Sequence, residues 1–446
     1  MKRRVVITGI GVVAPNGATT AEFWDNCLAL RSSVMPIPEH WSNYWQPLSR
    51  VWAPLPAIDF GARGIGRVER MQLDNSAMLA IVAAQEALEN ARLPFILSDE
   101  KKNIFSVAGF SGDRTAVFMG TGIGGISSFA GNEGNHILSP CSARLRQSEL
   151  PMDGFADVMR APSRFNPFVV PMTMPNSCSA VLGIRFSVTG ANRTICTACA
   201  SGTMAIGQAF DAITAGKADA ALAGGAEYLA DDYGGVFRGF DIAKTLVKNC
   251  DDPQTANRPF DQKRSGFLFA EGGSAVLVLE ELSRAQDRGA PVIAEVLSSA
   301  ETFDAHSVMS IDASAKQIRR MMIRALGEAN VTPGEIDYIN AHGTGTEQND
   351  EIEAMTIESV FGAQPLINAT KSLTGHTFGA AGAIETAVTA LSIARKTTHA
   401  CKNLEEPVRP LNFVTAAGPF EIRTALTQSF AFGGHNAGLV LREWAA

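Results

Sequence analysis

Three side chains stand where nucleophilic chemistry could occur. Cys199 lies in Thr197–Gly202 (TACASG), at the junction of a strand-like run and a helix-like segment. A thiol at a helix N-terminus feels the positive end of the helix dipole, which favours the thiolate. His342 and His376 each follow a strand-like run and are flanked by Gly and Thr, where an imidazole can exchange a proton. Each residue alone is also consistent with a buried structural cysteine or a hydrogen-bonded core histidine.

The turn within Ser429–Asn436 is a fourth candidate. Gly433 and Gly434 permit a tight turn with unusual backbone angles between two strand-like runs. The turn is either a plain hairpin or a place where backbone N–H groups meet a developing oxyanion.

Two cofactor-like motifs are incomplete. Gly120–Gly125 reads G-x-G-x-x-G after a strand, but the acidic ribose ligand expected about 20 positions later is missing. Cys196-x-x-Cys199 has no second Cys pair or suitably spaced His. Neither a dinucleotide site nor a zinc site is therefore expected.

The elements that must position these residues alternate between strands and helices. The pattern predicts an α/β protein. Strands are expected at residues 4–10, 115–119, 194–198, 218–223, 274–279, 336–340, 367–370 and 437–441, and helices at 21–29, 75–91, 202–216, 315–330, 347–361 and 379–396. The Pro- and Trp-rich stretch 34–56 is expected to be an ordered surface loop of unassigned role.

Two of the expected helices are rich in Gly and Ala, one in each half of the chain, at 202–216 and 379–396. Small residues allow a helix to be buried on nearly all sides. The pair therefore suggests two similar lobes packed through their centres, which we place at residues 1–257 and 258–446.

Composition excludes several classes of protein. The chain has 446 residues, 46% apolar and 19% charged, with a net charge of −7. No long Lys/Arg run marks a nucleic-acid surface, and no stretch of about 18 apolar residues marks a membrane span. The start at KRRVVITG reads as a buried first strand rather than a signal peptide. Seven cysteines, an odd number, suggest reduced thiols and a cytoplasmic location.

Taken in order, the motifs resemble the β-ketoacyl-acyl-carrier-protein synthase family, in its elongating type II branch. The resemblance covers nearly the whole chain, and it runs through KRRVVITGIGVVAPNG, Phe23-Trp24, GTGIGG, TACASG, ADAALAGGAE, Arg258–Asp261, NAHGTGT, TKSLTGHTFGAAGAIE and FAFGGHN. It implies the thiolase fold, in which two similar α/β lobes form five αβαβα layers, usually as a homodimer. It also implies a 3-oxoacyl-[acyl-carrier-protein] synthase that makes carbon–carbon bonds in fatty acid or polyketide/polyene synthesis.

The resemblance implies a role for each candidate residue. Cys199 would carry the acyl group as a thioester, and His342 and His376 would assist decarboxylation of malonyl. Lys371 would organise the site with Glu385 as its ion-pair partner. The other implied residues are Phe432, as gate and, with Cys199, oxyanion hole, Thr344 and Thr346 at the phosphopantetheine arm, and Gly433 and Gly434 in the gate turn.

The family's chemistry requires no metal or redox cofactor, because its substrates arrive on the phosphopantetheine of an acyl carrier protein. Asn340 and Glu353 match positions that frame a structural monovalent-cation site in some members. The expected partners are the carrier protein and a second copy of the chain, although a heterodimer with a ketosynthase-like partner is also consistent with the sequence.

Four segments depart from the family pattern. His435 stands where a small residue is usual, so it is expected to narrow the entrance or alter gating. Arg264–Phe267 (RSGF) replaces RDGF, and Asp304–Ser310 lacks the usual sequence beside the carrier arm. Glu347–Asp350 looks more like polyketide or polyene ketosynthases than housekeeping enzymes. Chain length, starter and cognate carrier are therefore left open.

Two rival interpretations share the fold. A thiolase needs a second catalytic cysteine near the C-terminus, where the last cysteine is Cys401 without a Gly-rich surround. A chain-length-factor-like partner of another ketosynthase would lack the nucleophile, whereas Cys199 is present.

Overall fold

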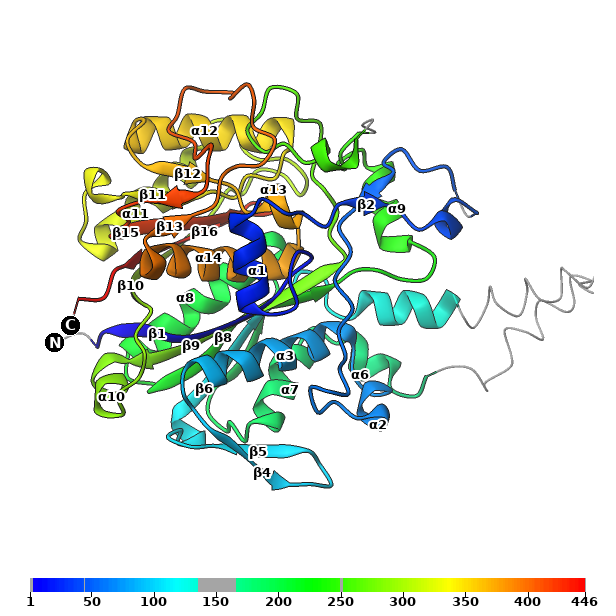
Figure 1. The fold of residues 1–446 in the computed structure, drawn as a ribbon, viewed down its shortest axis with the longest axis vertical. Helices are drawn as coiled ribbons and strands as arrows, with labels where there is room; N and C mark the ends of the chain where they lie inside the picture. Colours follow the sequence, from blue (N-terminus) through cyan, green and yellow to red (C-terminus); the bar gives the residue numbers. More distant parts are fainter. Residues whose placement is uncertain (1–2, 44, 135–165, 249–251, 446) are drawn as a thin grey trace, which may run out of the picture.

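The computed structural model describes residues 3–43, 45–134, 166–248 and 252–445. Its main sheet has ten strands in the order β12-β11-β15-β16-β10-β1-β9-β8-β6-β7 (Figure 1). These strands are β1 (Val5–Val13), β6 (Thr115–Gly120), β7 (Asn192–Ile195), β8 (Ala220–Tyr228), β9 (Gly272–Glu281), β10 (Ala294–Phe303), β11 (Tyr338–Asn340), β12 (Leu366–Asn368), β15 (Thr424–Phe430) and β16 (His435–Arg442). Three short hairpin-like pairs are β2 (Met35–Pro36) with β3 (Val51–Trp52), β4 (Phe95–Asp99) with β5 (Ile104–Val107), and β13 (Thr397–Thr398) with β14 (Gly418–Pro419).

The sheet consists of the same five-strand pattern twice. In one half, β6 is parallel to β7 and β8, and β9 is antiparallel to β8 and β1. In the other half, β11 is parallel to β12 and β15, and β16 is antiparallel to β15 and β10. Only three residue pairs between β1 and β10 join the halves. The expectation of two similar lobes is confirmed.

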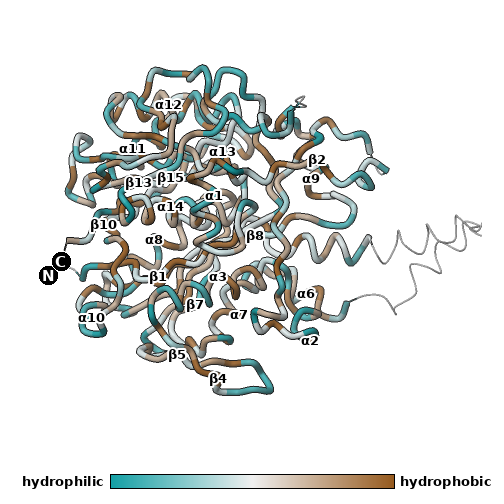
Figure 2. Tube along the Cα trace, in the orientation of Figure 1, coloured by the Kyte–Doolittle hydropathy of each residue, from teal (hydrophilic) through white to brown (hydrophobic). Residues whose placement is uncertain are grey.

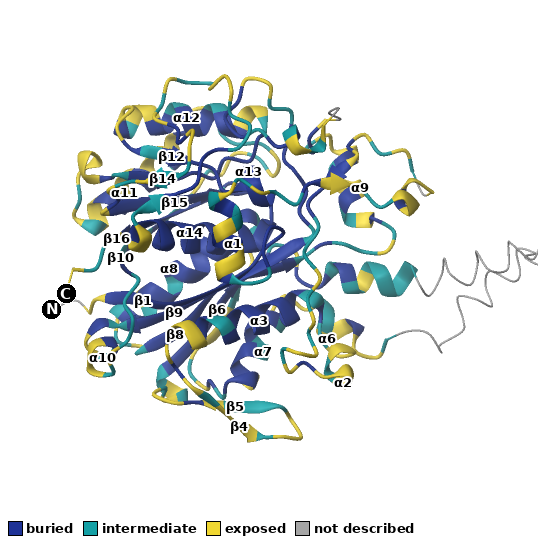
Figure 3. Ribbon diagram, in the orientation of Figure 1, coloured by how far each residue is buried: buried dark blue, intermediate teal, exposed yellow. Residues whose placement is uncertain are grey.

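Helices complete five layers, as expected for the thiolase fold. α3 (Asn75–Asn90) and α7 (Ser177–Arg185) cover the outer face of the first half-sheet, and α11 (Lys316–Ala329) and α12 (Glu347–Phe361) cover the outer side of the second. α8 (Ser201–Thr214) and α14 (Ala381–Arg395) lie between the half-sheets and contact both (Figures 1 and 3). The other α-helices of the described residues are α1 (Thr20–Leu28), α2 (Arg67–Arg70), α6 (Val169–Thr173), α9 (Gly235–Ile242), α10 (Leu282–Asp287) and α13 (Lys371–Thr374).

The two central helices cross closely because small residues face each other. A Cβ atom at Gly202 would lie 2.7 Å from the backbone nitrogen of Ala383, so only glycine fits there. Hydrophobic residues concentrate in these inner layers (Figure 2). The close crossing brings the N-termini of both helices to one place in the middle of the molecule.

The repeat extends to the turns that precede the central helices. Each helix follows a 3-10 turn, η4 (Ala198–Ala200) before α8 and η7 (Phe378–Ala380) before α14. The first residue of each turn is left-handed, with φ of +50° at Ala198 and +49° at Phe378. The two turns pack against each other, so Cys199 in the first turn faces the segment that carries His376.

Some expectations from the sequence differ from the structure. The strand expected at 194–198 ends at Ile195, because the chain turns into η4 before α8. Strand β10 was not expected, and β15 was expected only as a strand-like run before the Ser429–Asn436 turn, without bounds. The lobe boundary at residue 257 is not supported by strand pairing, because β9 lies beyond it and pairs with β1 and β8 of the first half.

The stretch 34–56 is not merely a surface loop. It contains β2, β3 and η1 (Glu39–Asn43), and the side chain of Trp41 is only 2% exposed, against α9. Among the helices of the described residues, none has the length and apolarity needed to cross a membrane.

Candidate active site

Cys199 is held in η4, immediately before α8, with only 3% of its surface exposed. Burial raises the pKa of its thiol to about 12, while the charge of Lys371 and the backbone N–H of Phe432 act in the opposite direction. The effect of burial on this pKa is therefore larger than the opposite effect expected from the helix dipole. The resting side chain is a thiol rather than a thiolate.

His376 lies next to the thiol. It follows α13, and its Nε2 is 3.0 Å from Cys199 Sγ. The backbone N–H of Phe378 points at His376 Nδ1 at 3.3 Å. Because Nδ1 accepts a hydrogen bond, the neutral ring carries its proton on Nε2 and donates toward the sulfur.

His342 completes the site from the end of β11. Its ring stands edge-on to His376 at 5.6 Å between centroids and 87° between planes. Lys371 Nζ lies 3.2 Å from His342 Nδ1 and donates to the His342 carbonyl oxygen at 2.6 Å. An ammonium has only donors, so His342 Nδ1 must accept and Nε2 must carry the proton.

Both histidines are neutral in this environment. Burial lowers the pKa of His342 and of His376 well below the ordinary 6.5, and the nearby Lys371 charge lowers both further. Lys371 is buried in an ion pair with Glu385. Burial raises the pKa of Glu385 to about 7, and Lys371 opposes that rise. The site thus offers two N–H donors without placing a second positive charge there.

Buried carboxyl groups hold the backbone around these residues. Glu353 on α12 accepts the N–H groups of His342 and Gly343 at 2.7 and 2.8 Å. Glu227, at the end of β8, accepts the N–H groups of Gly122 and Gly379. The G-x-G-x-x-G segment therefore serves as a structural loop beside Cys199, consistent with the absence of its acidic ribose ligand.

The C-terminal turn brings Phe432 to the nucleophile. Gly433 and Gly434 have φ of +86° and +87°, which glycine tolerates. The N–H of Gly433 donates to the Val308 carbonyl at 2.9 Å, which ties the turn to the segment that departs from the family pattern. The backbone N–H groups of Phe432 and Cys199 both interact with the sulfur and oppose the rise in the pKa of its thiol.

A cavity of about 440 Å³ opens on Cys199, His342 and His376. Thr344 and Thr346 line its wall, and their hydroxyl oxygens are 2.9 Å apart. Its other lining residues are Lys244, Thr245, Lys248, Ser265, Gly266, Phe267, Met309, Ser310, Ile311, Glu347, Gln348, Asn349, Phe430, Ala431 and Phe432. Three of the segments that depart from the family pattern therefore contribute to this cavity. Gln348 Nε2 of one of them donates at 3.2 Å to the carbonyl of Ile311, the residue directly after another.

His435 does not narrow the cavity. Its ring packs against Phe303 at 5.1 Å between centroids, and it is not among the lining residues. The expectation that His435 obstructs the entrance is wrong, because its position on β16 directs the side chain toward β10.

The side chains of Asn340 and Glu353, which match positions of a monovalent-cation site in some family members, are both fully buried. Asn340 on β11 pairs in register with Thr427 on β15. Gln428, the next residue on β15, donates a hydrogen bond to Glu353. Consecutive strand residues point to opposite faces of the sheet. Both Glu353 oxygens already accept N–H bonds. The buried side-chain oxygens without a hydrogen-bond partner include Asn340 Oδ1, Glu385 Oε2, Thr427 Oγ1 and Gln428 Oε1. Oxygen atoms of this kind suit a hard cation, so the cation site at Asn340 and Glu353 stays a prediction.

Cys196 and Cys401 do not line this cavity. Cys196 is exposed, with Sγ 3.3 Å from the Gly122 carbonyl. Cys401 is buried against the N–H of Ala369 and does not line the cavity. Across the described ranges, no group of three or more His, Cys, Asp or Glu side chains could hold a metal ion.

The sequence matches two family models, "Beta-ketoacyl synthase, N-terminal domain" over residues 2–285 and "Beta-ketoacyl synthase, C-terminal domain" over 293–405. The chain belongs to the β-ketoacyl synthase family. It is 34% identical to 3-oxoacyl-[acyl-carrier-protein] synthase 2 of Staphylococcus aureus (strain COL), over 100% of this chain and 99% of that protein. The two family models adjoin between residues 285 and 293, later than the boundary expected at 257.

Two solved structures of ketosynthases have the same fold. One is the type II polyketide synthase AntDE:AntF complex, an acyl carrier protein with its ketosynthase bound to the hexaketide (27% identity, TM-score 0.82). The other is the ishigamide ketosynthase/chain length factor (29% identity, TM-score 0.81). Each similarity covers 100% of both chains.

The structure brings together all four residues expected to be catalytic: Cys199, His342, His376 and Lys371. It adds two residues that the sequence did not single out, Phe378 beside His376 and Glu227 beside the Cys199 turn. Two signals were available: Phe378 lay inside the TKSLTGHTFG motif, two residues after a candidate histidine, and Glu227 was the last residue of the ADAALAGGAE motif.

Proposed function

We propose that this protein is a 3-oxoacyl-[acyl-carrier-protein] synthase, and that Cys199 holds the acyl group during decarboxylative condensation with malonyl-carrier protein. One observation carries the assignment of roles. His376 Nε2 lies 3.0 Å from Cys199 Sγ, and the partners of both Nδ1 atoms leave His342 and His376, which line the same cavity as Cys199, with Nε2–H donors.

The first step is acyl transfer. Cys199 Sγ attacks the carbonyl carbon of an acyl-carrier thioester, the carrier's C–S bond breaks, and the thiol proton of Cys199 ends on the released carrier thiol. The backbone N–H groups of Cys199 and Phe432 stabilise the tetrahedral oxyanion. The raised pKa of the resting thiol means that this proton moves during the step rather than before it.

Decarboxylation follows. The malonyl C–C bond breaks, CO₂ leaves, and the bonding electron pair forms an enolate on the remaining thioester. His342 and His376 stabilise the enolate oxygen with their Nε2–H groups. Their depressed pKa values keep them neutral, so they donate hydrogen bonds without protonating the carbon that must react.

Condensation closes the cycle. The enolate carbon attacks the acyl carbonyl on Cys199, a new C–C bond forms, and the C–S bond to Cys199 breaks. Cys199 leaves as a thiolate and regains a proton from water. Splitting the reaction into two transfers through one nucleophile predicts ping-pong kinetics.

The cavity mouth suits a carrier-bound substrate. Lys244 and Lys248 line it and can face the phosphate of a phosphopantetheine arm, while Thr344 and Thr346 offer hydroxyl groups along the wall. The exposed outer strand β7 provides an edge at which a second ketosynthase-type chain can pair. A homodimer is the simplest assembly, and a heterodimer with a chain-length-factor-like partner is the alternative.

Two observations disfavour the rival assignments. A thiolase would need a second cysteine at the site, whereas Cys401 lies in a separate hydrophobic cluster. A chain-length-factor-like scaffold would not need a nucleophile with two oriented histidines.

Mass analysis of the carrier-bound products tests the function. The protein is incubated with acyl-carrier and malonyl-carrier proteins, and the β-ketoacyl product should appear with wild-type protein and be absent with Cys199→Ala. Malonyl decarboxylation without any condensed product would refute the proposed function.

A further inference from the structure

One aromatic side chain stacks on His376, the histidine next to the Cys199 thiol. Phe378 stacks on His376 with 4.5 Å between ring centroids and 11° between planes, and it belongs to the turn that packs against the Cys199 turn. Its φ of +49° is a conformation that bulky residues rarely adopt. Strain at a site beside the reacting groups points to a function for that side chain.

Phe378 is part of a cluster of four rings, which we name the aromatic wall: Phe240, Phe267, Phe269 and Phe378. The centroid of Phe378 lies 4.9 Å from Phe240, 5.5 Å from Phe267 and 5.9 Å from Phe269. Phe267 also contacts His376 edge-on at 5.4 Å. The ring of Phe378 is thus held on several sides and cannot swing away without disturbing its neighbours.

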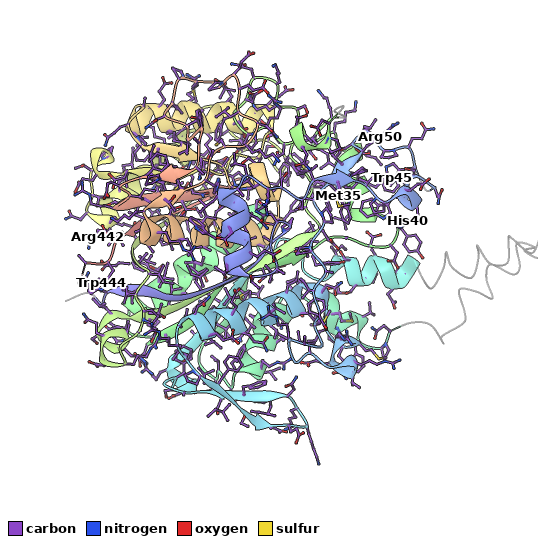
Figure 4. All side chains as sticks on the ribbon, viewed as in Figure 1. Met35, His40, Trp45, Arg50, Arg442 and Trp444 are labelled. Carbon is purple, nitrogen blue, oxygen red and sulfur yellow. The ribbon has the colours of Figure 1, made fainter. Side chains whose placement is uncertain are left out.

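The stretch 34–56 supports the wall from outside. Trp41 contacts Phe237 of α9 at 5.4 Å, and Phe237 contacts Phe269 at 5.2 Å. Asp241 on α9 accepts the backbone N–H groups of Leu48 and Ser49, each at 2.8 Å. Figure 4 shows Met35, His40 and Trp45 of this stretch beside α9. The unassigned Trp-rich stretch therefore fixes the helix that carries Phe240.

The cavity that opens on Cys199 meets one of the four rings of the aromatic wall. Phe267 lines it, whereas Phe240, Phe269 and Phe378 do not. The arm of malonyl-carrier protein must enter through this cavity, because His342 and His376 line it. An acyl chain on Cys199 then has to share the cavity with that arm or displace the aromatic wall.

We propose that the aromatic wall restricts the Cys199-bound acyl group to short chains, such as acetyl and butyryl, and that Phe378 is the residue that sets this limit. The inference rests on the proposed function, because it concerns the acyl group that Cys199 carries. A hydrophobic pocket discriminates by on the order of 10- to 200-fold for each methylene that does not fit, so chains beyond the limit should react much more slowly.

Acylation of Cys199 by acyl-pantetheine thioesters tests the proposal. Acetyl, butyryl, octanoyl and palmitoyl thioesters are compared by the initial rate at which the Cys199 peptide gains the acyl mass. Phe378→Leu enlarges the space and keeps an apolar side chain, and Phe378→Met is measured in parallel in case the first variant does not fold. Phe186→Leu is the matched control, because Phe186 is equally buried but belongs to a separate core cluster.

The wild type should favour acetyl and butyryl over octanoyl by at least about tenfold. A Phe378 variant should raise the ratio of the octanoyl rate to the butyryl rate by at least about tenfold. Phe186→Leu should leave this ratio unchanged. Wild-type rates that are similar for butyryl and palmitoyl, or an unchanged profile in both folded Phe378 variants, would overturn the inference alone. Failure of every thioester to modify Cys199 would overturn the proposed function as well.

Discussion

Replacing Lys371 by methionine removes a charge on which three buried groups depend. Lys371 Nζ donates to the His342 carbonyl, lies 3.2 Å from His342 Nδ1 and pairs with Glu385. The side chains of Lys371 and Glu385 are only 1% and 2% exposed. Lys371→Met therefore leaves a buried carboxyl without its counter-ion, which should lower the free energy of unfolding by about 3–5 kcal/mol.

The loss should depend on pH in a defined direction. Burial raises the pKa of Glu385 to about 7 even with Lys371 beside it, so removing Lys371 raises this pKa further. The folded variant then keeps a proton that the unfolded chain releases above its ordinary pKa of about 4.3. Because the unfolded state binds fewer protons, the free energy of unfolding falls as pH rises, by up to about 1.4 kcal/mol per pH unit until the folded pKa is reached.

Urea unfolding at acidic, neutral and alkaline pH measures this effect. Lys371→Met should be least stable at alkaline pH, and adding Glu385→Leu should recover stability and remove the extra slope. Malonyl decarboxylation should fall in both variants by about 10²–10³-fold, because His342 Nδ1 has lost the donor that fixes its tautomer. Lys263→Met, at a side chain that is 58% exposed, should cost no more than about 1 kcal/mol. If the Lys371→Met single variant keeps wild-type stability and a wild-type rate of malonyl decarboxylation, this reasoning is refuted.

Three further outcomes are expected. His342→Ala should still accept an acyl group on Cys199 but lose malonyl decarboxylation by about 10²–10³-fold, which single-turnover assays of the two half-reactions would separate. Because burial depresses the pKa of both active-site histidines below 6.5, they stay neutral as pH falls through that value; a decarboxylation rate that halves at the ordinary histidine pKa would contradict this. His435→Thr should leave the acyl-chain profile unchanged, since the ring packs on Phe303; a broadened profile in competition assays would count against the observed placement.

Much of the fold could be predicted from local patterns. The helix expected at 347–361 is observed with those bounds as α12, and the two Gly- and Ala-rich segments are the central helices. β10 was missed and β15 was given no bounds, because their sequences, AEVLSSAETF and TALTQSF, carry polar residues at buried positions. Those residues are bonded to distant parts of the chain, such as Gln428 to Glu353, and local periodicity contains no information about such partners.

The candidate site could likewise be predicted only in part. Residue type and position after a strand or before a helix indicated Cys199, His342 and His376. The protonation state of Cys199 could not be predicted, because helix position favours the thiolate while burial, a property of the folded state, raises the pKa to about 12. The contact of Phe378 with His376 likewise depends on a left-handed backbone angle that the sequence gave no reason to expect at phenylalanine.

Transfer of an acyl group through Cys199 is the central claim, and a two-stage mass experiment tests it most directly. The protein is first incubated with isotopically labelled butyryl-carrier protein, the excess is removed, and malonyl-carrier protein is then added. The label should appear on the peptide containing Cys199 and then leave it, with the carrier gaining a labelled β-ketoacyl group. Label that resides on Cys196 or another cysteine, or that stays on Cys199 after malonyl-carrier protein is added, would contradict the account.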